Sequence, residues 1–106
     1  MRETDIETTA AAREEGAVVV DVREPSEYRE GHVPGALSIP MGQLPGRVGE
    51  IDRDKPVHVI CASGNRSQAM ADLLEHQGFH AWSVAGGTKA WARSGRPLET
   101  GDPTRR

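Results

Sequence analysis

The sequence is short of cysteine, having only Cys61. No internal disulfide can form, and a lone thiol is either an inert buried residue or a nucleophile. Long apolar runs are also missing, since the longest, residues 17–20, is far too short to cross a bilayer. The polar residues 1–7 do not resemble a signal peptide. We therefore expect a soluble cytoplasmic protein in which the thiol stays reduced.

An excess of positive charge is absent as well. The net charge is −3, which argues against a nucleic-acid partner, and nothing in the sequence indicates a membrane partner. Apolar residues make up 36% and charged residues 27%, enough for one modest core and against disorder throughout. We predict one domain over residues 1–106, with a core at about 3–101, a loose tail at 102–106, and a monomeric state.

The histidines do not form a metal-binding pattern. His32, His58, His76 and His80 give no pair on one helix face, and no Cys-x2-Cys motif accompanies them. We predict no metal site and no cofactor. His32 lies in a turn-rich segment and is expected to act as a hydrogen-bonded anchor there.

Hydrophobic patterning predicts alternating strands and helices. Runs rich in β-branched residues predict strands at residues 17–22, 37–39, 57–60 and 79–84. Amphipathic spacing and capping residues predict helices at residues 4–15, 26–30, 66–77 and 88–94. Residues 43–51 are ambiguous, because proline and glycine interrupt a helical spacing. The alternation predicts an α/β fold of three layers, with a central, mainly parallel sheet of four or five strands and helices on both faces.

The segment that carries chemistry follows the predicted strand at 57–60. Cys61 ends this strand, a short loop of small residues (Ala62, Ser63, Gly64) follows, and a helix begins at once. In open α/β sheets, ligands bind at the carboxyl ends of strands. The sequence therefore places the thiol where a ligand would bind.

The physics of this loop favours an anion. Small residues let the backbone curl so that successive N–H groups point at one centre. The following helix directs its positive end at the same place, and Arg66 adds a permanent cation. We expect these groups to lower the pKa of the Cys61 thiol and to hold an anionic sulfur.

Each of these residues also has a purely structural interpretation. Cys61 would be a small apolar core residue; Ser63, Asn65 and Ser67 would be helix-capping residues; Arg66 would be a solvated residue of a first helical turn. An inert core cysteine needs no polar loop beside it, and a cation at the positive end of a helix indicates an anionic ligand.

The end of the strand at 17–22 leaves a similar choice. Arg23 could add positive potential to the same rim as Cys61, whereas Asp21 is better explained as the structural partner of an arginine. Glu27 and Tyr28 are interpreted as packing and turn residues.

Five landmarks in order resemble a rhodanese homology domain over residues 3–101. They are Val18–Arg23 with Glu27-Tyr28, Gly31–Ala36, the Cys61 loop, Gly86-Gly87 with Ala90-Trp91, and Gly95–Pro97. The resemblance implies a sulfurtransferase of the thiosulfate type. Cys61 would attack the sulfane sulfur of a small anionic donor, sulfite would leave, and a thiol, cyanide or a partner protein's cysteine would take the sulfur from the Cys61 persulfide.

The resemblance also assigns the site residues. Main-chain N–H groups would cradle the sulfur, and Arg66 would bind the donor's anionic end. The cradle residues are Ala62, Ser63, Gly64, Asn65, Arg66 and Ser67.

Loop length separates this interpretation from its nearest rival. Related phosphatases and arsenate reductases resemble a Cys-x5-Arg pattern, whereas Cys61 and Arg66 form Cys-x4-Arg, a smaller ring that suits one sulfur better than a phosphate. A non-enzymatic relay that docks a protein acceptor is a second alternative. Ala62 stands where many thiosulfate enzymes have a basic residue, which leaves the natural donor open.

Overall fold

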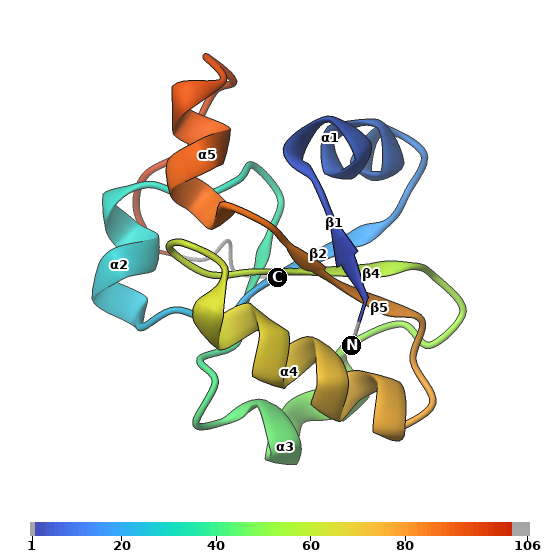
Figure 1. Ribbon diagram of the computed structural model, residues 1–106. Coiled ribbons are helices and arrows are strands. Elements are labelled where there is room, and N and C mark those ends of the chain that lie inside the picture. The colour runs from blue at the N-terminus through green and yellow to red at the C-terminus, as the bar shows by residue number, and fades with distance from the viewer. Residues whose placement is uncertain (1, 103–106) are drawn as a thin grey trace.

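The computed structural model describes residues 2–102, which form a five-stranded sheet with helices on both sides (Figure 1). All strand pairings are parallel, in the order β1-β5-β4-β2-β3. The strands are β1 (Glu3–Thr4), β2 (Val18–Asp21), β3 (Leu37–Ser38), β4 (Val57–Ile60) and β5 (Ala81–Val84). The helices are α1 (Ile6–Glu14), α2 (Pro25–Glu30), α3 (Leu44–Arg47), the 3₁₀ turn η1 (Val48–Glu50), α4 (Asn65–His76) and α5 (Gly87–Arg93).

The predicted α/β class is confirmed, and the helices divide into two layers. Helices α3 and α4 cover one face of the sheet, while α1, α2 and α5 cover the other (Figure 1). Two hydrophobic clusters fill the two gaps. Val59 and Leu74 belong to the first, and Ile60 and Trp91 to the second.

The central strands are buried on both faces, as their unbroken β-branched runs predict. Every residue of β4 is buried, and so are three of the four residues of β2. Side chains of successive strand residues point to opposite faces, so a strand with helices on both sides needs apolar residues at nearly every position. The neighbouring β2, β4 and β5 therefore form a rigid base for the segments that follow them.

The predicted helix start at Thr4 is wrong, because Thr4 belongs to a short strand. Arg2 and Thr4 accept hydrogen bonds from the N–H groups of Ser83 and Ala85, at 2.8 Å each, which makes β1 an edge strand beside β5. Helix α1 starts two residues later, and Asp5 caps it by accepting from the Thr8 N–H at 2.7 Å. A two-residue strand has no period of its own, so only its tertiary partner reveals it.

The ambiguous segment at residues 43–51 contains one short helix and a 3₁₀ turn. Pro45 lies in the first turn of α3, where its missing N–H costs nothing. Gly101, the last residue of the predicted core, donates to the carbonyl of Arg29 at 2.9 Å. Of the predicted tail, only Asp102 is described, and residues 103–106 lie outside the described residues. Within residues 2–102, no helix combines the length and the apolar character that crossing a membrane would require.

Candidate active site

Main-chain donors surround the sulfur of Cys61, which directly follows β4. The N–H of Gly64 donates to Sγ at 3.1 Å, and the N–H of Ser67 does so at 3.4 Å. The Ser67 hydroxyl lies 3.5 Å from the same sulfur. Cys61 itself is only 1% exposed. The thiol is thus enclosed, but polar donors aim at it, which an inert apolar core cysteine would not need.

Two opposing effects act on the Cys61 thiol. Burial raises its pKa, because a buried charge loses its hydration. The Ser67 hydroxyl and the N–H groups of Ser67, Gly64 and Ser63 lower the pKa, because they stabilise the thiolate. The donors prevail together, and the pKa lies below the ordinary value near 9. The loop therefore favours the nucleophilic form of the residue.

Glycine allows the loop to turn back onto the sulfur. Gly64 is the N-cap of α4 and has φ +107°, a left-handed conformation that other residues rarely adopt. A Cβ there would also lie 3.3 Å from the backbone nitrogen of Gly86. Because the cap is a glycine, the capping role considered for Ser63 and Asn65 is not observed. Both residues are exposed beside the buried cradle.

The N-terminus of α5 holds the outer side of the loop. The Thr88 N–H and hydroxyl donate to the Cys61 carbonyl at 2.8 and 3.1 Å, and the Lys89 N–H donates to the Ala62 carbonyl at 3.1 Å. Within a planar trans peptide the N–H points opposite to the C=O. Fixing these carbonyls on α5 therefore turns the N–H groups of Ala62 and Ser63 away from it, consistent with the Ser63 amide acting on the sulfur.

Sequence reasoning missed this support by Gly87 and Thr88. Gly87 permits it, since a Cβ there would lie 2.5 Å from the Cys61 carbonyl oxygen and 2.6 Å from that of Ala62. The Gly86-Gly87 pair was the available signal, because adjacent glycines before a helix indicate a close backbone approach. The approach is to a loop 25 residues earlier in the chain, which local pattern does not reveal.

Behind the sulfur, a second serine extends the hydrogen bonding into the sheet. The hydroxyls of Ser67 and Ser83 lie 2.8 Å apart, and neither residue is exposed. When Cys61 is ionised, the Ser67 hydroxyl donates to the sulfur and is then free to accept from Ser83. Strand β5 thus contributes to the site through Ser83, which the sequence analysis did not single out.

The structure gives Arg66 an anionic partner within the chain. Its guanidinium donates two hydrogen bonds to the Glu27 carboxylate, at 2.8 and 2.9 Å. The sequence analysis expected an anionic ligand for Arg66, whereas the structure shows a carboxylate of the same chain, Glu27, which had been assigned only to packing and turns. Glu27 does contribute to the turn as well, by accepting from the Glu24 N–H at 3.1 Å.

The guanidinium of Arg23 is bound by structural partners within the chain. It binds Asp21, with the shortest contact at 2.7 Å, and donates to the Gly31 carbonyl at 2.8 Å. Both side chains of the ion pair are buried, at 7% and 0% exposure. The structural interpretation of Asp21 is confirmed. These contacts balance the charge of Arg23 and leave its buried guanidinium unavailable to a donor.

The aromatic and imidazole groups are structural. His32 stacks on Tyr28, with ring centroids 3.6 Å apart, and its Nδ1 lies 2.7 Å from the Tyr28 carbonyl, as expected of a turn anchor. Trp91 packs in the core and donates from Nε1 to the Pro97 carbonyl at 2.9 Å. Among residues 2–102 no group of three or more potential ligands could hold a metal ion.

A parallel α/β sheet with a cysteine in a ring of amides at a strand end is an arrangement typical of proteins that bind an anion or hold a thiolate there. The family described as the rhodanese-like domain matches residues 5–94. This chain belongs to that family.

Named relatives agree with this assignment. The thiosulfate sulfurtransferase GlpE of Pseudomonas syringae pv. syringae (strain B728a) is 41% identical over 95 residues, covering 89% of each chain. The putative sulfurtransferase YtwF of Bacillus subtilis (strain 168) is 39% identical over 95 residues, 85% of this chain and 92% of that protein. A rhodanese-related protein from Thermoplasma volcanium has a TM-score of 0.86 at 32% identity, covering 95% of this chain and 100% of the other. The relatives support sulfurtransferase activity in general.

Proposed function

We propose that the protein transfers sulfane sulfur from thiosulfate, or a similar small anionic donor, through a persulfide on Cys61. The observation that carries the proposal is the set of donors aimed at Sγ from Gly64, Ser67 and Ser63. Because Cys61 is the only cysteine, it is the one residue able to carry the sulfur. A working thiol has to stay reduced, and we propose the cytoplasm as its compartment.

The first half-reaction loads the sulfur. The Cys61 thiolate attacks the outer sulfur of thiosulfate and forms a new S–S bond. The original S–S bond breaks, and its electron pair leaves with sulfite. No general base is needed when the thiol is already ionised, and its lowered pKa raises the ionised fraction. The terminal sulfur of the persulfide is anionic, so the same amides can stabilise it.

The second half-reaction unloads it. Cyanide, a small thiolate or a cysteine of a partner protein attacks the terminal sulfur. The Cys61–sulfur bond breaks and Cys61 leaves as a thiolate, which the loop again stabilises. Because loading and unloading use one covalent intermediate, the kinetics should be ping-pong.

Phosphate chemistry is less well supported by the same geometry. The loop has the shorter Cys-x4-Arg spacing, and the guanidinium of Arg66 is held by Glu27. A phosphatase of this kind needs a wider ring and an arginine directed at the oxyanion. Hydrolysis of an aryl phosphate would therefore contradict the proposal.

Intact-protein mass spectrometry after thiosulfate treatment tests the proposal directly. We expect the mass to rise by one sulfur atom, a dithiol to reverse the gain, and Cys61→Ser to show none. Turnover with cyanide or a dithiol then separates an enzyme from a relay that passes sulfur only to a docked protein. A wild-type chain that gains no sulfur would overturn the proposal.

A further inference from the structure

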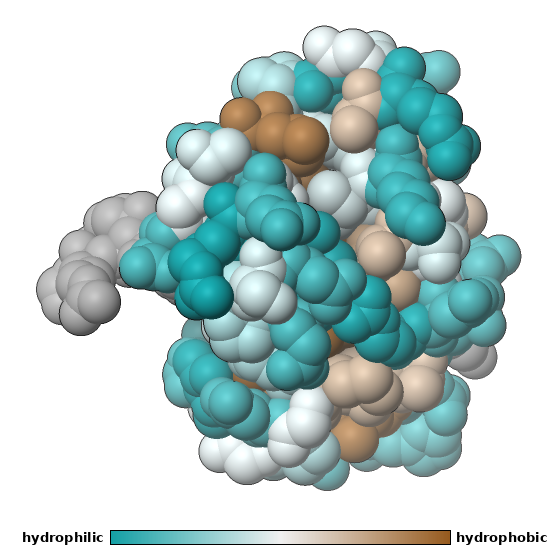
Figure 2. Space-filling view, turned by 90° about the vertical axis from the view of Figure 1, so that its left-hand side faces the viewer, coloured by the Kyte–Doolittle hydropathy of each residue, from teal (hydrophilic) through white to brown (hydrophobic). Residues whose placement is uncertain are grey.

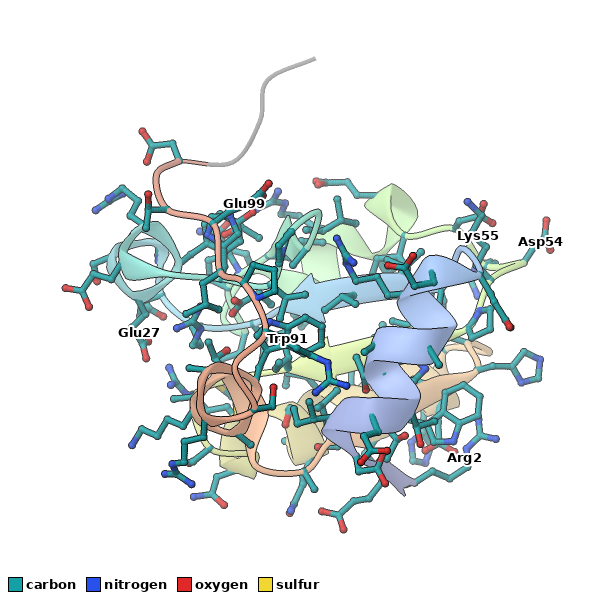
Figure 3. All side chains as sticks on the ribbon, turned by 90° about the horizontal axis from the view of Figure 1, so that it is seen from above. Arg2, Glu27, Asp54, Lys55, Trp91 and Glu99 are labelled. Carbon is teal, nitrogen blue, oxygen red and sulfur yellow. The ribbon has the colours of Figure 1, made fainter. Side chains whose placement is uncertain are left out.

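The ion pair of Arg66 and Glu27 joins the start of α4 to α2. Arg66 occupies the first turn of α4, directly before Ser67, which donates to Cys61. The pair raises the pKa of Arg66, and the nearby Cys61 charge raises it further, so this guanidinium senses charge at the reaction centre. Figure 3 shows Glu27, on α2, at one end of the molecule, with Asp54 and Lys55 at the opposite end.

Glu27 remains ionised under ordinary conditions. The Arg66 hydrogen bonds lower the pKa of its carboxyl group to about 2. Both side chains are about one-third exposed, so an incoming ion can reach the pair. The side of the molecule on which α2 lies is largely hydrophilic, with smaller apolar areas between the hydrophilic residues (Figure 2). A dissolved donor that approaches this surface therefore meets the opposite charges of Arg66 and Glu27.

Four charged groups form a cluster at this rim: Asp21, Arg23, Glu27 and Arg66. Two are carboxylates and two are guanidiniums, so the formal charges cancel. Their coupling extends beyond the two ion pairs, because Arg23 also lowers the pKa of Glu27, and Asp21 also raises that of Arg66. Without the charge of Glu27, the cluster would carry one net positive charge beside the sulfur.

We propose that Glu27 is a specificity-determining residue, whose carboxylate cancels the charge of Arg66 and thereby disfavours doubly charged sulfur donors relative to singly charged ones. The inference rests on the proposed sulfur transfer through Cys61. An anion that approaches Arg66 has to displace the carboxylate or share the guanidinium with it. The cost grows with the charge of the anion, since the repulsion from Glu27 is proportional to that charge.

Two donors separate charge from chemistry. Thiosulfate carries two negative charges, and methanethiosulfonate, in which a methyl group replaces one oxygen, carries one. In both, the Cys61 thiolate attacks the terminal sulfur and an S–S bond breaks. The electron pair leaves with sulfite in the first case and with methanesulfinate in the second. The ratio of their kcat/KM values therefore reports how the site discriminates by charge.

The experiment measures thiocyanate formation with cyanide as acceptor for the wild type and Glu27→Gln. The amide keeps the shape of the side chain and can still accept from Glu24 and Arg66. We expect kcat/KM to rise about tenfold for thiosulfate and about threefold for methanethiosulfonate, mainly through KM. The preference for the doubly charged donor then increases about threefold, and added salt weakens the effect.

Two controls isolate the contact from general charge. Glu30→Gln makes the same charge change at an exposed position of the same helix, and should leave the donor ratio unchanged. In Glu27→Gln/Arg66→Gln the cluster is again neutral, so the ratio should return close to the wild-type value. If Glu27 only supported the fold, its substitution would lower the thermal midpoint and change kcat/KM for the two donors by the same factor.

The outcomes are distinguishable from those of the proposed function. An unchanged donor ratio in Glu27→Gln, with sulfur still loaded on Cys61, overturns the role of Glu27 and leaves the sulfurtransferase intact. A ratio that moves equally in Glu30→Gln also overturns it, because long-range charge alone would explain the change. A wild-type chain that loads no sulfur from either donor instead overturns the proposed function.

Discussion

At the scale of single residues, burial and hydrogen bonding have opposite effects on the pKa of the Cys61 thiol. Cys61 is buried beneath its own loop, which by itself would make the thiol a weak acid. Donors on Ser67, Gly64 and Ser63 reverse that effect. The balance depends on a few contacts of 3.1 to 3.5 Å, so single substitutions should move it.

The first prediction concerns the acidity of this thiol. Thiolate absorbance near 240 nm, followed against pH, should give a midpoint below that of a free cysteine, and the lone Cys61 makes the signal unambiguous. Ser67→Ala should raise the midpoint by about one pH unit, the effect of one hydrogen bond of about 1 to 1.5 kcal/mol.

Two further variants test the cause. Ser83→Ala removes the hydroxyl partner of Ser67 and should move the midpoint the same way by a smaller amount. Ser26→Ala, at an exposed position of α2, should not move it. A wild-type midpoint equal to that of free cysteine would show that burial outweighs the donors.

A second residue-scale prediction concerns the buried pair of Arg23 and Asp21. Arg23→Met leaves the Asp21 carboxylate buried without its partner, which should lower the free energy of unfolding by about 3 to 5 kcal/mol. Arg29→Met removes an exposed pair with Asp102 and should cost less than about 1 kcal/mol. Urea unfolding measures both, and equal losses would contradict the assignment.

At the scale of elements, the active loop depends on two helices and two strands. Strand β4 delivers Cys61, α4 begins on the loop, and β5 supplies Ser83 behind it. Helix α5 binds the outward carbonyls through Thr88 and Lys89. The direction of the amides is therefore decided by contacts between elements, and disturbing α5 should affect chemistry at a distance.

The third prediction uses two glycines around α5. Gly87→Ala introduces a Cβ that overlaps two carbonyl oxygens of the loop, and should lower sulfur-transfer activity at least about tenfold and stability by about 1 to 3 kcal/mol. Gly95→Ala has a similar left-handed φ but open space around its Cβ. It should lose stability from backbone strain alone and keep its activity; equal activity losses would argue against the α5 contact.

At the scale of the whole molecule, the helical layer on one face is tied to the sheet by a buried histidine. The Nδ1 atom of His58, in β4, lies 2.9 Å from the hydroxyl oxygen of Thr9, in α1. Thr9 is fully buried. Burial lowers the pKa of His58, so the folded state disfavours its charged form. Trp82 lies beside this histidine, and the guanidinium of Arg2 stacks on Trp82.

The fourth prediction is a fall in stability with acid that begins near pH 6.5. Below that value the unfolded chain protonates His58 while the folded chain resists, so the unfolded state binds more protons. The free energy of unfolding should fall as pH decreases, by up to about 1.4 kcal/mol per pH unit, until the folded pKa is reached.

Urea unfolding at several pH values, for the wild type and His58→Gln, measures this dependence. In His58→Gln, the free energy of unfolding should change less with pH between pH 7 and 5 than in the wild type. Carboxylates with lowered pKa values affect stability only at more acidic pH, since the pKa of Glu27 falls from its ordinary 4.5 to about 2. An identical slope in His58→Gln would assign the effect to other groups.

The longer elements could be predicted because each one carries its own pattern. Strand β4 was placed at its observed bounds, and α4 within one residue, since a run of buried β-branched residues and a helical apolar stripe are local properties. The same holds for Cys61 at the end of a strand and for the small residues after it. The two-residue β1 lacked any such pattern, because its hydrogen bonds run to β5.

The α/β class, the position of the cysteine and the curling, donor-rich loop arise from neighbours along the chain, so they could be predicted without a structure. Which carboxylate pairs with Arg66 depends on the folded arrangement, since Glu27 lies 39 residues away. That arrangement also determines that Thr88 orients the amides and that Ser83 reaches Ser67. Side-chain partners depend on how the packed layers meet, and packing joins residues that have no fixed spacing in the chain.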